Sequence, residues 1–224
     1  NMQRALFLLL FLAISLGQLV ISIHKPASIC VPKDFDSIQA ALDAAPAGAR
    51  IWIDSRQGPY IENLVISTAN LHLRSANGRA IIRGDSQQNS VVHIFADGVL
   101  FAGFRIEQGN TGILLDRLSG VRIEENEIRN GIQGIGLIDA TGNSLKRNHI
   151  GPNDSIGILL QRSSQNHFAH NTMIDNTVGG VFLEQGSVEN RFEQNHIERS
   201  DMAVRLMTSN ANFFIANRIV ENRT

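Results

Sequence analysis

Side chains able to carry acid–base chemistry follow short Gly-Ile-x-Leu segments in the second half of the chain. Asp116 follows the segment at 112–115, and Asp139 follows the one at 134–137. Two carboxyl groups can hydrolyse a glycoside when they lie about 5–5.5 Å apart (retention) or about 6.5–9.5 Å apart (inversion). We therefore take Asp116 and Asp139 as the candidate catalytic pair. Candidate substrate-binding side chains follow the next two segments: Gln161, Arg162 and Glu184.

Two other interpretations of these residues stay open. A polysaccharide lyase would need a base and a positive charge or Ca²⁺ to neutralise the uronate, so Ca²⁺ is the one cofactor considered, and only for a lyase. No metal site is expected otherwise. Alternatively, the residues form a solvated column of turn side chains without catalytic function.

An asparagine that recurs every 22 to 24 residues indicates the element that positions these side chains. Around each copy, the residues three before and two after the asparagine are apolar. Five copies at a fixed period are typical of a repeat architecture. The asparagines are Asn126, Asn148, Asn171, Asn195 and Asn217.

The Gly-Ile-x-Leu segments recur with the same period, about thirteen residues before each asparagine. Two short segments per repeat, with period-2 alternation and Gly, Asn, Asp or Ser between them, predict strands joined by tight turns. Such coils are stable only when stacked. The segment at 121–128 also fits a leucine-rich repeat, but that fold usually has helical spacing in its other half. The pattern favours an all-β, right-handed parallel β-helix.

In this fold the asparagines are expected to form a structural ladder along the axis. Asparagine tolerates left-handed turn conformations, and its amide both donates and accepts hydrogen bonds. Coils about 4.8 Å apart would place Asp116 and Asp139 roughly 5–8 Å from each other. The alternation of inward and outward residues along a strand also turns Leu114, Leu159 and Phe182 outward. We expect that a loop or a partner chain covers them or, alternatively, that they form an exposed apolar platform. Four further asparagines suggest a second ladder: Asn143, Asn166, Asn190 and Asn212.

The N-terminal region predicts export followed by one domain. Residues 1–17 have the charge and apolar run of a signal peptide, with an uncleaved anchor as the alternative. Residues 18–28 are assigned to a linker and 29–224 to the β-helix, with regular coils from about 112 to 222. An amphipathic segment at about 36–45 is expected to cap the first coils. The protein would be secreted or periplasmic.

Charge and the C-terminal sequence bear on partners. The 224 residues carry a net charge of −1, which argues against nucleic acid and, once a signal peptide is cleaved, against a membrane partner. Nothing after Asn222 resembles a cap, so a partner or a further segment is expected to cover the C-terminal end.

The sequence DFDSIQAALDAAPAGARIWIDSRQGPYIENLVI, followed by ADGVLFAGFRI and the Asn-x-Ile coils, resembles the NosD-like carbohydrate-binding and sugar-hydrolysis (CASH) proteins of the pectin-lyase-like fold. The resemblance covers residues 29–222. It implies that the protein binds or processes a polysaccharide or oligosaccharide. Alternatives are a non-catalytic scaffold such as a copper-delivery accessory protein, and an extracellular adhesin or assembly module. Copper finds little support, because His149 and His196 lie two coils apart.

Overall fold

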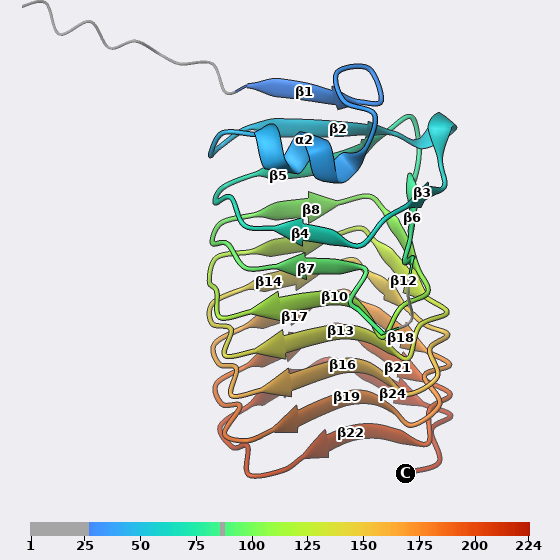
Figure 1. Cartoon of the computed structure of the whole chain (residues 1–224). Helices are drawn as coiled ribbons and strands as arrows, with labels where there is room; N and C mark the ends of the chain where they lie inside the picture. The colour runs from blue at the N-terminus through green and yellow to red at the C-terminus, as the bar shows by residue number, and fades with distance from the viewer. Residues whose placement is uncertain (1–26, 86–87) are drawn as a thin grey trace, which may run out of the picture.

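A computed structural model describes residues 27–85 and 88–224, which wind into a stack of coils with parallel strands (Figure 1). Three sheets run along the stack, and each strand pairs with the equivalent strand of the next coil. The predicted all-β parallel β-helix is therefore confirmed. The leucine-rich-repeat alternative is wrong, because that fold usually has a helical segment in the second half of each repeat. Here strands such as β10 (Thr111–Asp116) and β13 (Gln133–Ile138) occupy that half.

Sheet A contains nine strands: β1 (Ser28–Val31), β2 (Arg50–Asp54), β5 (His72–Ala76), β8 (Leu100–Ala102), β11 (Arg122–Glu124), β14 (Ser144–Lys146), β17 (His167–Ala169), β20 (Arg191–Glu193) and β23 (Phe213–Ile215). Sheet B contains eight: β3 (Tyr60–Ile61), β6 (Ile81–Arg83), β9 (Arg105–Glu107), β12 (Glu127–Arg129), β15 (His149–Ile150), β18 (Thr172–Ile174), β21 (His196–Glu198) and β24 (Arg218–Val220).

Sheet C contains seven strands, including the predicted Gly-Ile-x-Leu segments: β4 (Leu64–Ile66), β7 (Val92–Ile94), β10, β13, β16 (Ile156–Gln161), β19 (Gly179–Glu184) and β22 (Met202–Leu206). A single 3₁₀ turn, η1 (Ser55–Gln57), follows β2 in the described chain.

Apolar side chains from all three sheets fill the interior of the stack. The residues three before and two after each ladder asparagine are buried as predicted, except in the last coil, where Phe214 is half-buried and Ile219 exposed. Phe168, Phe192 and Phe214 stack on one another with ring centroids 4.4 and 4.8 Å apart. The aromatic rings of successive coils thus stack along the axis of the core, in line with the strand pairing.

The first asparagine ladder forms as predicted. Nδ2 of each asparagine donates to Oδ1 of the next at 3.0–3.1 Å. The same Oδ1 accepts from the backbone N–H of the previous asparagine, as in Asn126 to Asn148 at 3.0 Å. The expected left-handed conformation falls on the preceding residue instead, for example Glu125 (φ 59°) and Arg147 (φ 54°). The second ladder, from Asn143 to Asn212, has the same geometry at 2.9–3.1 Å.

A third polar column was not predicted from the sequence. Asn153 donates from Nδ2 to Oδ1 of Asn176 at 2.9 Å, and Asn222 accepts from the backbone N–H of Ser200 at 3.0 Å. Asn153 and Asn176 are almost fully buried. Because a serine replaces asparagine in one coil, the column lacks the uniform repeat that revealed the other two.

Helix α2 (Ile38–Ala44) covers the N-terminal edge of sheet C, as expected for a cap (Figure 1). Its Gln39 side chain donates to the Val65 carbonyl at 3.2 Å and accepts from the Val65 N–H at 2.8 Å, which satisfies the edge of β4. Glu62 accepts from the backbone N–H groups of Ile38 and Gln39, both at 2.9 Å. A carboxylate at this end is favoured by the helix dipole.

The last coil leaves inward-facing side chains accessible: Leu206 is 48% exposed and Ile219 47%. The predicted signal peptide and most of the predicted linker lie outside the described residues. Within the described part, no helix is long and apolar enough to cross a membrane.

Candidate functional site

The outer face of sheet C carries the sequence-predicted site. Leu114 aligns with Gly136 on the next strand, then with Leu159, Phe182 and Arg205. His93 precedes Leu114 in the same column. The neighbouring column contains Asp116, Ile138, Gln161 and Glu184.

A hollow of about 160 Å³ lies in this face beside Gly136. Leu114 and Leu159 flank it on the neighbouring strands, and the half-buried Gln133 and Gln161 add amide groups. A Cβ at Gly136 would lie 2.8 Å from Nε2 of Gln133 and 3.1 Å from Cδ1 of Leu114. The hollow therefore combines apolar walls with hydrogen-bonding groups, and its volume suits part of a sugar ring rather than a whole drug-sized ligand.

Phe182 does not extend this apolar surface. The residue is 2% exposed, because the Arg205 guanidinium lies 4.3 Å above the ring centroid and the ring edge packs over Gly179. Arg205 also donates to Glu184. Of the three side chains that alternation turns outward, only Leu114 and Leu159 flank an open space.

Asp116 lies at the end of β10 and is held by a neighbouring arginine. Its Oδ2 accepts from Arg117 Nη2 at 3.0 Å and lies 3.6 Å from Nε2 of His93. Burial lowers the pKa of His93, and this outweighs the opposing effect of the Asp116 carboxylate. A neutral imidazole beside a carboxylate can accept a proton. His93 was not predicted from the sequence, since it lies in an irregular coil.

Asp139 lies one position beyond the strand and binds a different arginine. Arg162 donates from Nε and Nη2 to the two carboxylate oxygens at 2.8 and 3.0 Å, and from Nη1 to Gln185. Hydrogen bonding to Arg162 and its positive charge hold the pKa of Asp139 below its ordinary range, against a smaller effect of burial. A carboxyl group that remains ionised cannot act as a general acid.

The structure brings the two predicted carboxylates to adjacent coils in different columns. Asp116 aligns with Ile138, so Asp139 is offset by one residue. Each carboxylate has its own arginine partner, and the catalytic assignment of the pair stays a prediction. Of the predicted binding residues, Gln161 lines the hollow, Arg162 bridges Asp139 and Gln185, and Glu184 pairs with Arg205.

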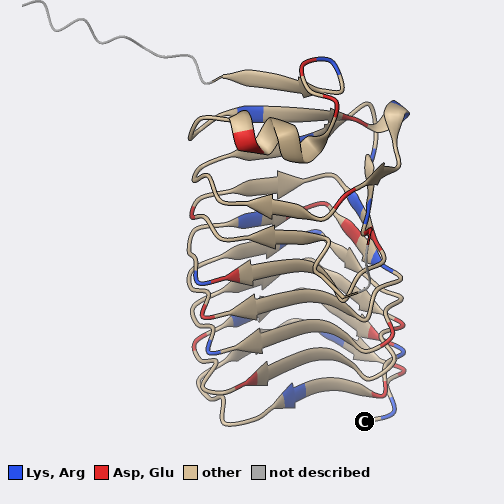
Figure 2. Ribbon diagram, viewed as in Figure 1, with Lys and Arg blue, Asp and Glu red and all other residues tan. Residues whose placement is uncertain are grey.

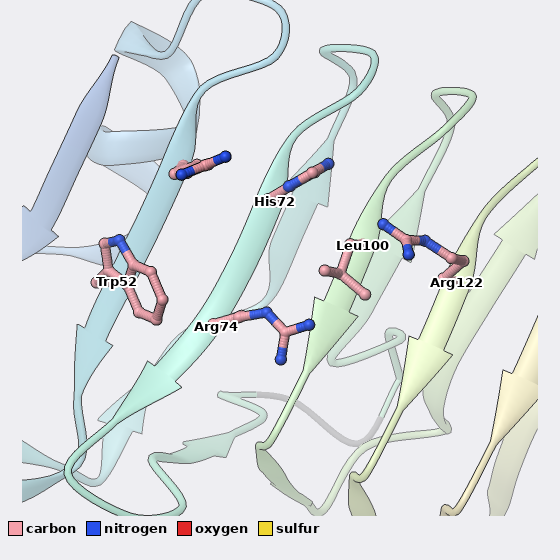
Figure 3. Close-up of a pocket in the computed structure, with 6 residues that line it drawn as sticks. Trp52, His72, Arg74, Leu100 and Arg122 are labelled. Carbon is pink, nitrogen blue, oxygen red and sulfur yellow. The ribbon is translucent and has the colours of Figure 1, made fainter. Parts of the chain in front are cut away.

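A second hollow, of about 310 Å³, lies on the N-terminal half of sheet A and was missed by the sequence analysis. Arg50, His72, Leu100 and Arg122 form one outward column, and Trp52 and Arg74 belong to the next. In Figure 3, Arg74 and Arg122 lie on either side of Leu100, and Trp52 stands on the first strand of the group.

Within the described residues, no group of three or more His, Cys, Asp or Glu side chains is placed to hold a metal ion. His149 and His196 are separated by Thr172 on the strand between them. The arrangement offers no copper cluster in this part of the chain.

Sequence and structure comparisons agree with this architecture. A model of the right-handed β-helix region matches residues 49–220. The chain belongs to the right-handed β-helix family. The chain is also 31% identical, over 86% of its length, to a cell surface glycoprotein of Methanothermus fervidus, and spans 38% of that protein.

Solved structures share the fold at low sequence identity. A periplasmic alginate epimerase matches 87% of this chain with a TM-score of 0.56 and 16% identity, and 55% of the epimerase chain is covered. A Dettilon tailspike protein matches 71% with a TM-score of 0.52 and 14% identity, and 40% of that chain is covered. At these identities the likeness concerns the fold.

Proposed function

We propose that this β-helix binds a polysaccharide on the outer face of sheet C, outside the cytoplasm. The observation that carries the proposal is the hollow at Gly136. Its leucine walls suit the apolar C–H faces of a sugar ring, and the amides of Gln133 and Gln161 can donate to and accept from hydroxyl groups. Sheet C continues along the axis with a coil repeat of about 4.8 Å, so a polymer held at the hollow would extend towards His93 on one side and Arg205 on the other.

The arrangement favours binding over hydrolysis. Asp139 is ionised and engaged by Arg162 through two hydrogen bonds. Asp116 is bound to Arg117. A glycoside hydrolase needs one carboxyl group that can give up a proton near neutral pH. If this face is catalytic, proton abstraction by His93 beside Asp116 fits the geometry better than an Asp116–Asp139 pair.

The comparisons support the extracytoplasmic placement. The related Methanothermus fervidus protein is named a cell surface glycoprotein, and the solved epimerase is named periplasmic and acts on alginate. More narrowly, we propose that the chain binds or processes a saccharide in the way that its resemblance to the NosD-like CASH proteins implies. Because the chain spans less than two thirds of both proteins, their whole activities do not transfer with the fold.

A structural role at the cell surface is the second candidate, and the same relative favours it. A stacked solenoid can act as a rigid spacer without binding a saccharide. In that case the hollow on sheet C would be a consequence of packing alone.

A binding and turnover screen separates these candidates. The full chain is titrated with neutral and uronate-rich polysaccharides, with and without Ca²⁺, while products are followed by chromatography. Binding without products supports the proposal. Products that disappear in Asp116→Asn and Asp139→Asn would establish the carboxylate pair as catalytic. Absence of binding to every polymer would favour the structural role.

A further inference from the structure

We infer that the hollow on sheet A is a second binding site, which takes the carboxylate groups of an acidic polysaccharide. The site consists of Arg50, Arg74 and Arg122 around Leu100, with His72 and Trp52 (Figure 3). It lies on a different sheet from the hollow at Gly136. The choice of a polysaccharide as ligand rests on the proposed function, while the anionic character follows from the site itself.

The three arginines lack acidic partners in the described structure. No carboxylate oxygen lies within 4.0 Å of Arg50, Arg74 or Arg122, whereas outside this site every described arginine except Arg218 has such a partner. On sheet B, for example, Glu107 accepts from both Arg83 and Arg129. Basic and acidic segments are interleaved along the side of the stack that carries β12, β18, β21 and β24 (Figure 2).

On the rest of sheet A, in contrast to this site, charged side chains have partners of opposite charge. Beyond Arg122, Glu124 stacks on Lys146, and Glu193 accepts from Arg191 at 3.0 Å and lies 3.4 Å from His167. Opposite charges on neighbouring strands are stabilising, and like charges are destabilising. At the N-terminal half the like charges of Arg50 and Arg74 lie on neighbouring strands. A bound anion would remove that repulsion.

The shape of the site suits a carboxylated sugar. Each guanidinium presents a planar fork that matches a carboxylate through two hydrogen bonds. Trp52 is 37% exposed and offers an aromatic face beside these donors, and the buried Leu100 lies between Arg74 and Arg122. One ring of a uronate polymer could stack on the Trp52 face while its carboxylate meets an arginine.

Nucleic acid fits the site less well. Proteins that bind it strongly neutralise about six to ten phosphates, and this site supplies three arginines on a chain of net charge −1. A surface outside the cytoplasm, as proposed above, meets polysaccharides instead.

The test uses the fluorescence of Trp52, the single tryptophan of the chain, which lines this site and also a neighbouring hollow at Cys30 and Arg56. The arginine variants below therefore locate the response. The full chain is titrated with de-esterified polygalacturonate, its methyl-esterified form, dextran sulfate and single-stranded polynucleotide. We expect a saturable change with polygalacturonate that is absent with the methyl ester. Arg74→Gln and Arg122→Gln should each weaken this binding about tenfold or more. Arg218→Gln, which removes an exposed, unpaired arginine of sheet B, should leave it unchanged.

Several results would overturn the inference. These are no fluorescence change with polygalacturonate, equal binding of the methyl ester, equal losses in all three arginine variants, or stronger binding of dextran sulfate or polynucleotide. Gly136→Leu, which fills the hollow on sheet C, separates the two proposals. Polygalacturonate binding that survives Gly136→Leu and fails in Arg74→Gln locates the ligand on sheet A, whatever the outcome for sheet C.

Discussion

Asn126 and Asn148 are joined across one coil by two hydrogen bonds to a single oxygen. Oδ1 of Asn148 accepts from the backbone N–H of Asn126 at 3.0 Å and from its Nδ2 at 3.1 Å. Nδ2 of Asn148 donates in turn to the Ile123 carbonyl at 2.8 Å and to Asn171. One buried side chain therefore satisfies two backbone groups of the preceding coil and bonds the asparagine side chain of the next.

Replacing Asn148 by alanine should destabilise the β-helix severely. The change removes the Asn148 partner of the buried Asn126 backbone N–H and of the Ile123 carbonyl, and leaves Nδ2 of Asn126 with only its bond to the Phe101 carbonyl. Each unsatisfied group in a dry interior costs about 1–3 kcal/mol. The measurement is the free energy of unfolding in urea. Asn217→Ala, in the partly exposed last coil, is the matched control and should cost less because water can replace the lost bonds. Equal losses in both variants would contradict this account of the ladder.

The Glu107 carboxylate should contribute to acid sensitivity. Burial raises its pKa, but hydrogen bonds from Arg83 and Arg129 outweigh that effect and leave the pKa lowered. A carboxyl group with a lowered pKa in the folded state stabilises the fold above its unfolded pKa and loses this contribution as the pH falls through the folded value. Glu107→Gln should therefore be less stable than the parent near pH 7, and the difference should shrink in strong acid. A difference independent of pH in urea titrations would show that the charge is unimportant.

Acid should also strengthen polygalacturonate binding at the sheet A site. Burial, together with the charges of Arg122, Arg50 and Arg74, lowers the pKa of His72, so the free protein keeps a neutral imidazole near pH 7. A bound carboxylate opposes this shift, and binding is then coupled to proton uptake. From about pH 7.5 to about pH 5.5 the affinity should rise while the polymer remains ionised. In His72→Gln this rise should vanish; an unchanged pH profile would exclude His72 from the site.

The regular coils were predictable from the sequence because their constant period reports the stacking geometry directly. Asn126 to Asn217, and the apolar residues around them, follow from that period alone. The partners of Asp116 and Asp139 were less accessible, because the strand register pairs Asp116 with Ile138 and leaves each carboxylate to a separate arginine.

The sheet A site was not predictable for a related reason. Arg50, His72, Leu100 and Arg122 form one column, but their spacings in sequence are 22, 28 and 22 residues. The longer coil between His72 and Leu100 breaks the period, so no repeat pattern aligns these residues. Only the strand pairing brings Trp52 and the arginines to one surface.

Isothermal titration of the full chain with polysaccharide, comparing Gly136→Leu with its control, tests the central claim most directly. The titrations use the polymer that binds most tightly in the screen. Every variant also carries Arg74→Gln, which disables the sheet A site. A leucine at Gly136 occupies the space between Leu114 and Leu159 and displaces the Gln133 side chain, and Thr172→Leu adds a leucine to the outer face of sheet B instead. The proposed function predicts at least about tenfold weaker binding for Gly136→Leu and unchanged binding for Thr172→Leu. Unchanged binding in Gly136→Leu would contradict it.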